Sequence, residues 1–413
     1  MKRVQNNYIF DTKLNAQKMV FLSGPRQVGK TTFAEKELKT RNDEALYFNW
    51  DDPYVKKEYL ANPHFLESYL VKSKSKLPLV VFDEIHKHKN WKNILKGLYD
   101  TYKNKAQFLI TGSARLEYFT RSGDSLVGRY FSYNMLPLGV AEAAQDFSHI
   151  LKSESILSRP QENNILKLLN SIEEKKFHPA FTKLLHYGGF PEPFLSLSDA
   201  FCFKWRKNYR ELLTKEDLRD LTRVHDLKGI EQLILILPEH IGSSLSINAL
   251  KKDLQVNHKT VAVWIEALKK IYLVFTIAPW AKSINRAIKK EPKLYFYDWQ
   301  FATSEGSKFE NMLAISLLRA VMRFNEMGLG EFELRYVKNT AKEEIDFLIV
   351  KNNQPLALFE AKLSETDIPK GAHNLAKTIN VPYYQVVAQK DILEARPDNK
   401  YIVSAWRLGA ILG

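Results

Sequence analysis

Eight residues near the N-terminus have the types and spacing of a phosphate-binding loop. Residues 24–31 fit the pattern Gly-x-x-x-x-Gly-Lys-Ser/Thr. In such a loop the glycines let backbone N–H groups wrap phosphates, the lysine reaches the β- and γ-phosphates, and the hydroxyl binds Mg²⁺. We therefore expect Lys30 to act in catalysis and Thr31 to be a Mg²⁺ ligand. The residues expected to hold ATP are Gly24, Pro25, Arg26, Gln27, Val28, Gly29, Lys30, Thr31 and Thr32.

A second motif agrees with this loop. Residues 79–84 read as an apolar strand that ends in two carboxylates. Asp83 is placed to hold Mg²⁺, and Glu84, one residue later, can polarise the attacking water as a general base. Taken alone, two acids after a strand would more often be a solvated strand end. Together with the loop they predict a site that hydrolyses ATP.

Two further segments could complete this site. The apolar run 108–111 is followed by Gly112 and Ser113, and either Thr111 or Ser113 could orient the water, with Ser113 favoured. Arg129 precedes a fifth strand, where an arginine could enter the nucleotide site of a neighbouring subunit and stabilise transition-state charge. Such a role would require at least a dimer, and a surface arginine is the alternative. The rival arginines are Arg115 and Arg121.

The C-terminal part contains an acid-acid-lysine constellation. Asp346 begins one apolar strand, while Glu360 and Lys362 end the next and share one face of it, because side chains alternate along a strand. Glu310 lies on a predicted helix, 307–323. Two carboxylates can bind Mg²⁺ and a lysine can help to activate water. We expect catalytic roles for Asp346, Glu360 and Lys362 and Mg²⁺ ligation by Asp346, Glu360 and Glu310, although inactive carboxylates at a strand edge would give the same pattern.

The elements that must position these residues change in character along the chain. In the first third, apolar runs at 18–24, 45–50, 79–82, 108–111 and 130–136 alternate with helical patterns, which predicts a parallel α/β sheet. The middle, about 141–218, has mostly helical periodicity. The last part, from about 292, combines the helix 307–323 with three strands, at 332–337, 344–350 and 356–361.

Residues 230–280 have the element order of a winged helix. Helices at 232–240, 246–254 and 258–270 are followed by a strand at 271–277. If the last helix is a recognition helix, its first residues would meet a major groove, and nearby lysines would contact phosphates. Winged helices that join domains or bind proteins are the alternative. The groove residues would be Asn257, His258, Lys259 and Thr260, and the phosphate contacts Lys251, Lys252, Lys269 and Lys270.

The motifs at 24–31, 80–84, 111–113 and 125–129 resemble those of AAA-type ATPases. More closely, they resemble a prokaryotic group with a Gly-Pro-Arg-Gln-x-Gly-Lys-Thr loop and a C-terminal domain of unknown function related to PD-(D/E)xK nucleases. The resemblance covers nearly the whole chain. It departs from the nuclease motif at Ile345, which stands where proline gives that motif its name.

This resemblance, together with the patterns above, implies an α/β protein in four parts. A P-loop AAA-type ATPase core with a parallel sheet would occupy residues 1–140 and a helical, lid-like segment 141–225. A winged-helix unit would follow at 226–285, and an α/β PD-(D/E)xK nuclease-like domain at 286–413.

Composition narrows the partners. The 61 Lys and Arg against 47 Asp and Glu give a net charge of +14, which favours polyanionic partners such as double-stranded DNA. The single cysteine, Cys202, excludes an internal disulfide. No run reaches the ~18 apolar residues of a membrane span, and the first residues do not lead into the apolar core of a secretory signal. We therefore expect a cytoplasmic protein without a membrane partner.

The sequence as a whole predicts an AAA-type ATPase that binds and hydrolyses ATP with Mg²⁺. It would act on or with DNA as a homo-oligomer, with a C-terminal domain that resembles Mg²⁺-dependent nucleases. The alternative is a nucleotide-dependent switch that binds a protein partner and carries a catalytically silent nuclease-like fold. A small-molecule kinase fits less well, because Glu84 suits water as the acceptor.

Overall fold

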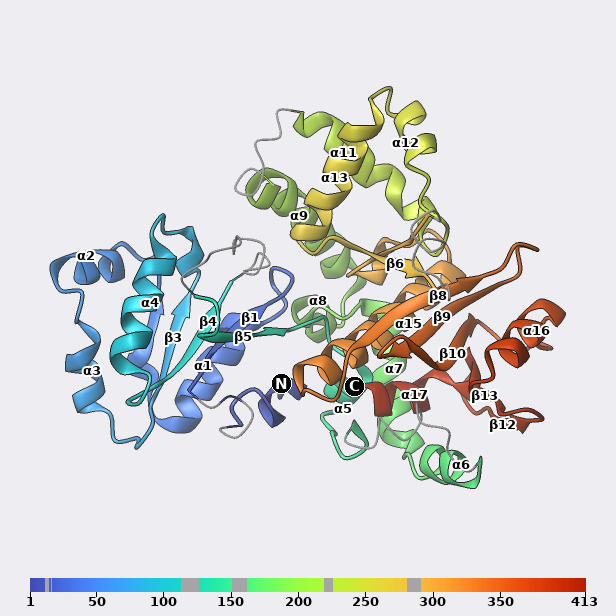
Figure 1. Cartoon of the computed structure of the whole chain (residues 1–413), viewed down its shortest axis with the longest axis horizontal. Coiled ribbons are helices and arrows are strands. Elements are labelled where there is room, and N and C mark those ends of the chain that lie inside the picture. The colour runs from blue at the N-terminus through green and yellow to red at the C-terminus, as the bar shows by residue number, and fades with distance from the viewer. Residues whose placement is uncertain (12–14, 16, 113–125, 151–161, 219–225, 281–290) are drawn as a thin grey trace. The chain divides into compact units, whose positions relative to one another are not determined.

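The computed structural model describes the chain except for residues 12–14, 16, 113–125, 151–161, 219–225 and 281–290 (Figure 1). The chain divides into two compact units. The N-terminal unit is Lys2–Leu136 with Lys270–Tyr272, and the C-terminal unit is Pro137–Lys269 and Leu273–Gly413 with Met1. Among the described residues, no helix has both the length and the apolar character needed to cross a membrane.

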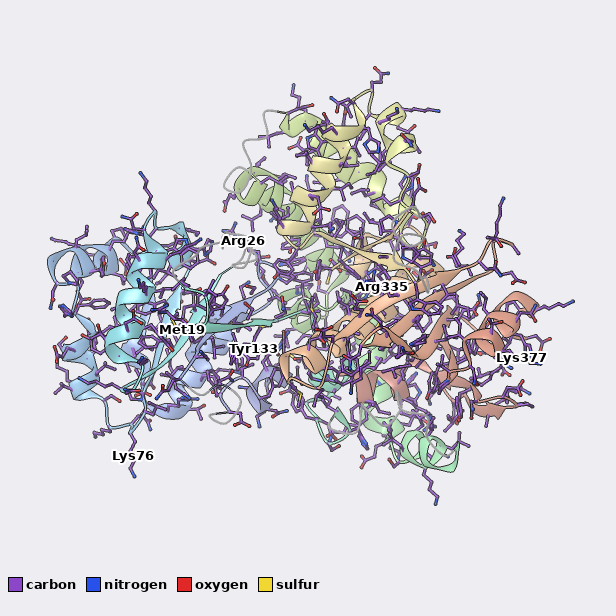
Figure 2. All side chains as sticks on the ribbon, viewed as in Figure 1. Met19, Arg26, Lys76, Tyr133, Arg335 and Lys377 are labelled. Carbon is purple, nitrogen blue, oxygen red and sulfur yellow. The ribbon has the colours of Figure 1, made fainter. Side chains whose placement is uncertain are left out.

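The N-terminal unit is built on a five-stranded sheet in the order β2-β3-β4-β1-β5. Every neighbouring pair is parallel, which confirms the predicted parallel α/β sheet. Strands β1 and β3 are buried along their whole length, as expected of apolar strands inside a parallel sheet. Met19 on β1 and Tyr133 on β5 are labelled in Figure 2. The strands are β1 (Met19–Ser23), β2 (Tyr47–Asn49), β3 (Leu79–Asp83), β4 (Gln107–Thr111) and β5 (Tyr130–Asn134).

Helices alternate with these strands along the chain. Helix α1 follows the phosphate-binding loop directly and contacts β3 and β4. Helix α4 buries Trp91, Ile94, Leu95 and Leu98, a spacing that gives it one apolar face. The helical elements are η1 (Val4–Asn7), α1 (Lys30–Arg41), η2 (Glu44–Leu46), α2 (Pro53–Ala61), α3 (Leu66–Lys72), η3 (Ile85–Lys87) and α4 (Trp91–Tyr102).

The C-terminal unit begins with helices. Helix α7 ends at Tyr187 and α8 begins at Pro191, so the turn between them contains Gly188 and Gly189. Helices α11, α12 and α13 form one group (Figure 1). The elements are α5 (Val140–Ala144), α6 (Glu162–Asn170), α7 (Glu174–Tyr187), α8 (Pro191–Ser196), α9 (Asp199–Leu212), the π-helical turn η6 (Leu213–Asp217), α11 (Leu227–Ile236), η7 (Leu237–His240), α12 (Ile247–Asp253) and α13 (His258–Lys270).

An eight-stranded sheet follows in the order β12-β13-β11-β10-β9-β8-β6-β7. Strands β8, β9 and β10 form an antiparallel meander, and β11 then runs parallel to β10. Arg335, labelled in Figure 2, lies on β8. The strands are β6 (Val274–Pro279), β7 (Lys293–Phe296), β8 (Phe332–Lys338), β9 (Glu344–Lys351), β10 (Gln354–Lys362), β11 (Tyr383–Val387), β12 (Leu393–Arg396) and β13 (Lys400–Ser404); the helical elements are η8 (Trp299–Phe301), α15 (Glu305–Glu326), α16 (Lys370–Ile379) and α17 (Ala405–Leu412).

Several boundaries differ from those expected. The helix expected at 232–240 begins at Leu227 and ends at Ile236, where a 3₁₀ turn containing Pro238 takes over, because proline cannot donate an N–H to continue an α-helix. The strand expected at 271–277 is β6, which begins three residues later; Tyr272, at φ +58°, belongs to the turn that ends α13. Strands β7 and β11–β13 and helices α16 and α17 were not predicted.

Candidate functional site

The phosphate-binding loop joins β1 to α1 at the carboxyl edge of the N-terminal sheet. Its backbone has positive φ at Gly24 (+155°), Gln27 (+59°) and Gly29 (+99°). A Cβ added to Gly24 would lie 2.1 Å from the carbonyl oxygen of Met135. Only glycine fits there, which explains the first glycine of the motif by close backbone approach as well as by dihedral angle.

Lys30 begins α1 and is 6% exposed. Its Nζ donates to the carbonyl oxygens of Gly24, at 2.9 Å, and Pro25, at 2.7 Å. The ammonium therefore lies within the curve of the loop, next to the positive N-terminal end of α1. A helix N-terminus and a lysine that converge in this way form a binding site for phosphate.

Asp83, at the end of β3, connects three strands of the sheet and helix α1. Its Oδ2 accepts from the hydroxyls of Thr31 (2.8 Å) and Tyr47 (2.7 Å), and its Oδ1 accepts from the hydroxyl of Thr111. The register places Asp83 beside Asn49 on β2 and Thr111 on β4. Carboxylate and hydroxyl oxygens side by side are the donors that Mg²⁺ takes in nucleotide sites, so Thr31 and Asp83 fit that ion.

The role of Tyr47 was not expected from the sequence. Burial, followed by the hydrogen bond to Asp83, raises the pKa of Tyr47, so its hydroxyl stays protonated and donates to Asp83. Tyr47 begins the three-residue strand β2. A tyrosine in a short strand carries no sequence signal of this contact, which depends on the lateral register between β2 and β3.

Glu84 follows Asp83 in a left-handed backbone conformation, with φ +56°. Its Oε2 lies 3.5 Å from His86 Nε2 and 3.7 Å from Lys87 Nζ. Burial raises the pKa of Glu84, while Lys30 and Lys87 oppose that shift. Burial also lowers the pKa of His86 to about 4, so this imidazole is neutral near pH 7.

The proposed water-orienting residues have different outcomes. The Thr111 hydroxyl is engaged by Asp83 and is fully buried, so it positions that carboxylate. Ser113, the favoured residue, lies outside the described residues, as do Arg115 and Arg121.

Arg129 lies at the opposite edge of the sheet from the phosphate-binding loop. Its carbonyl accepts from the N–H of Met19, where β1 begins. Its guanidinium bonds the Asp100 carboxylate on α4, at 3.0 and 3.2 Å. The loop follows the other end of the same strand, so Arg129 cannot contact a nucleotide on its own loop.

The C-terminal acids gather around a lysine that the sequence analysis missed. Lys293 Nζ lies 2.7 Å from Glu344 Oε1, 3.1 Å from Asp346 Oδ1 and 3.6 Å from Glu310 Oε1. Burial lowers the pKa of Lys293, but the surrounding carboxylates outweigh it and raise that pKa overall. Burial and the neighbouring Asp346 raise the pKa of Glu310 to about 7. The only sequence feature that points to Lys293 is its position as a charged residue at the start of the apolar strand β7.

The structure also brings Glu360 and Lys362 to this region. Asp346 Oδ2 accepts from the backbone N–H of Ala361 at 3.1 Å, so β9 and β10 hold Asp346 beside Glu360. Lys362 Nζ lies 2.8 Å from Glu360 Oε1, and the Tyr383 hydroxyl donates to Glu360 Oε2. Asp346 and Glu310 both raise the pKa of Lys362, after Glu360. The four predicted side chains therefore converge.

This arrangement does not fit Mg²⁺. Within the described ranges, no group of three or more His, Cys, Asp or Glu side chains is arranged to hold a metal ion. The Lys293 ammonium lies between the carboxylates of Glu310 and Asp346, and both oxygens of Glu360 contact protein groups. Two of the predicted metal ligands, Glu310 and Asp346, thus contact Lys293, and the third, Glu360, contacts Lys362.

The predicted recognition helix is α13. Its first residues, His258 and Lys259, are exposed, but the Asn257 side chain caps the helix by accepting from the Thr260 N–H at 2.8 Å. Lys269 pairs with Glu266 at 2.8 Å. Asn257 is therefore explained by capping, which leaves His258 and Lys259 as the side chains that face solvent at the start of the helix.

Two family models match the sequence. Residues 16–144 match a model described as an AAA domain, and residues 178–303 match a domain of unknown function (DUF8612). The second match ends before α15, so it does not include the C-terminal acids.

Curated relatives cover most of the chain at low identity. An uncharacterized protein of Methanocaldococcus jannaschii is 26% identical over 376 residues, which span 87% of this chain and 78% of that protein. An uncharacterized protein of Mycobacterium tuberculosis is 24% identical over 285 residues, spanning 69% of this chain and 55% of that protein.

Solved structures give weaker similarity. Aeropyrum pernix ORC1 in complex with DNA matches with a TM-score of 0.29 and 14% identity, over 73% of this chain and 88% of that one. AMPPCP-bound DnaA from Aquifex aeolicus matches with a TM-score of 0.28 and 13% identity, over 65% of this chain and 89% of that one. Similarity at this level carries no conclusion on function. The match of residues 16–144 to the AAA domain, which encloses the phosphate-binding loop and Asp83, supports an AAA-type ATPase in the N-terminal unit.

Proposed function

We propose that this protein binds and hydrolyses ATP in its N-terminal unit. The observation that carries the proposal is the convergence of Lys30, Thr31 and Asp83 at one edge of a parallel sheet, at the N-terminus of α1. These are the groups that phosphoryl transfer to water requires, because catalysis there is mostly positioning and charge stabilisation.

In this proposal each residue has one task. The loop N–H groups bind the phosphates, and Lys30 turns from the Gly24 and Pro25 carbonyls to the β- and γ-phosphates. Thr31 and Asp83 would hold Mg²⁺, which neutralises developing charge on the phosphate oxygens. Glu84 accepts the proton of the attacking water. Arg129 acts on the site of a neighbouring subunit, which makes the active form a homo-oligomer; its distance from its own loop supports this.

We further propose that the ATPase acts on or with DNA. The net charge of +14 and the exposed His258 and Lys259 at the start of α13 support it. So does the order of α11, α12, α13, β6 and β7, in which bridges from Ile241 to Leu294 and from Ser244 to Lys293 add a third stretch beside β7. This order supports a winged helix, proposed at 226–285 between a helical segment at 141–225 and the last domain at 286–413. Strand β7 (Lys293–Phe296) would extend it past residue 285.

For residues 286–413 we propose a PD-(D/E)xK nuclease-like fold. The order α15, β8, β9, β10, α16, β11, with the acids on α15, β9 and β10, supports it. Because Lys293 occupies the carboxylates, this domain would hold DNA rather than cut it.

The second candidate is a nucleotide-dependent switch that binds a protein partner. The specific observation in its favour is again Lys293, because a nuclease-like fold whose acids are neutralised internally has no cleavage to contribute.

One experiment separates the two candidates. ATP turnover is measured with and without duplex and single-stranded DNA at low salt, where electrostatic binding is strongest. Stimulation by DNA that is absent in Lys30→Ala, but present in Lys39→Ala on an exposed position of the same helix, supports the DNA-acting ATPase. Turnover that no DNA changes would favour the protein switch, and no turnover above that of Lys30→Ala would refute hydrolysis.

A further inference from the structure

The region around Glu310, Glu344 and Asp346, here named the C-terminal carboxylate cluster, contains a buried positive charge. The Lys293 side chain is 2% exposed, and its Nζ lies within 3.6 Å of an oxygen of each of the three acids. Glu344 and Asp346 share one face of β9, because they are two residues apart on a strand. Glu310 approaches from α15.

Lys293 is held in place by its own backbone. It begins β7, pairs with Ile277 on β6 and forms a bridge to Ser244 on its other side. Its ammonium lies 5.6 Å from the centre of the Tyr336 ring. A side chain fixed at both sides of its strand and enclosed in this way cannot move its charge into solvent without opening the sheet edge.

The acids are fixed as firmly as the lysine. Glu310 Oε1 accepts from the Tyr295 hydroxyl at 2.8 Å, and Gly242 packs so closely that an added Cβ would lie 2.6 Å from that carboxylate. Asp346 is tied to the Ala361 N–H, and Glu344 also pairs with Lys338 at 2.8 Å. The three carboxylates are therefore held in place around the Lys293 ammonium, with an oxygen of each acid 2.7–3.6 Å from Nζ.

We propose that Lys293 is the resident cation of the C-terminal carboxylate cluster and excludes divalent metal ions from it. A divalent ion between Glu310 and Asp346 would lie next to the Lys293 ammonium, and two cations cannot share that space without strong repulsion. The lysine thus does what a metal would do for the fold, which is to neutralise the acids. The inference builds on the proposed nuclease-like fold and makes it a metal-free, binding form.

The test is a titration of the nucleotide-free protein with Mn²⁺, in which the electron paramagnetic resonance signal of free Mn²⁺ measures how much is bound. The variant Asp346→Asn keeps an oxygen that can accept from the Ala361 N–H but removes one carboxylate. Mn²⁺ binding that this variant weakens therefore occurs at the cluster. We expect wild type and Asp346→Asn to bind Mn²⁺ equally. Lys293→Met should gain one site per chain at least tenfold tighter than any in wild type, and the double variant Lys293→Met/Asp346→Asn should lose it.

The matched control is Lys338→Met, which removes a lysine that contacts Glu344 but leaves Lys293 in place; it should bind Mn²⁺ like wild type. If Lys293→Met does not fold, Lys293→Met/Glu344→Gln keeps the net charge of the cluster and is measured instead. Wild-type Mn²⁺ binding that Asp346→Asn weakens would overturn the proposal, and so would a Lys293 variant that folds but gains no site. Mn²⁺ binding is measured without ATP or DNA. A failure of this proposal can therefore be distinguished from a failure of the proposed ATPase function.

Discussion

At the scale of single residues, the ATP site depends on carboxylates whose surroundings differ. Asp83 accepts three hydroxyl hydrogen bonds, which fix the orientation of its carboxylate. Glu84, one residue later, has ion-pair neighbours but is buried, and burial raises its pKa. The two adjacent acids therefore have different surroundings, which agrees with the proposed roles of Asp83 as a Mg²⁺ ligand and Glu84 as the base.

Glu84→Gln tests the role of the base. We expect turnover to fall by about 10²–10⁴-fold with unchanged nucleotide affinity, because a general base contributes about that much to rate. The base works only when deprotonated, and its pKa is raised above 4.5, so wild-type turnover should fall as the pH drops through a value above 4.5. That acidic limb should be absent from the residual activity of Glu84→Gln. Glu67→Gln, at an exposed position of α3, is the control; an unchanged pH profile in Glu84→Gln would exclude Glu84 as the base.

At the scale of elements, the backbone that follows β5 packs against the loop between β1 and α1. Met135 follows β5 directly, and its N–H donates to the Ser23 carbonyl at 2.8 Å. This contact brings the Met135 carbonyl against Gly24. The conformation of the loop therefore depends on the residue that follows β5 as well as on its own glycines.

Gly24→Ala should deform that loop. We expect a loss of about 1–3 kcal/mol in the free energy of unfolding, because the added Cβ meets backbone that cannot move aside. Binding of a fluorescent ATP analogue should be lost with it. Gly97→Ala is the matched control: it lies inside α4 with no atom within 4 Å of the new Cβ, so it should be neutral or stabilise by about 0.5–1 kcal/mol. Normal nucleotide binding by Gly24→Ala would contradict the close-approach explanation.

At the scale of the whole molecule, the proposed hydrolysis site needs a second chain if Arg129 acts as an arginine finger. Arg129 stands at the opposite edge of the sheet from the loop and is held by Asp100. If Arg129 contacts a nucleotide as proposed, that nucleotide belongs to another subunit. Oligomer formation would then control turnover, because each nucleotide site would need Arg129 from a neighbouring subunit.

Mixing two inactive variants tests this arrangement. Arg129→Ala alone should lower turnover by about 10³–10⁵-fold, the usual contribution of an arginine finger, without loss of ATP binding. Mixed with Lys30→Ala after subunit exchange, it should regain part of the wild-type turnover, because an intact loop then faces an intact arginine. Arg41→Ala, on α1, should behave like wild type. Full activity of Arg129→Ala, or no recovery in mixed oligomers, would reject the trans role.

The amino-acid sequence was sufficient for the parts that depend on local pattern. The residue types of the loop at 24–31, the apolar strands that end at Asp83 and Thr111, and the alternation of strands and helices all follow from contiguous residues, and the structure contains them. The turn between β9 and β10 also has a local cause, since Asn352 and Asn353 tolerate the positive φ of a two-residue turn.

Only the tertiary structure decided which of these residues meet. Tyr47 reaches Asp83 through the register of two strands that are far apart in the sequence. Lys293 reaches the C-terminal acids because β7 joins, beside β6, a sheet whose strands β8 to β10 come later in the chain. An ion pair between residues far apart in the sequence leaves no periodic pattern, because it depends on which residues are neighbours in space and not on their spacing along the chain. The sequence therefore predicted the acids of both sites and the association of Asp83 and Glu84 with the phosphate-binding loop, whereas only the fold determined that the C-terminal acids hold Lys293.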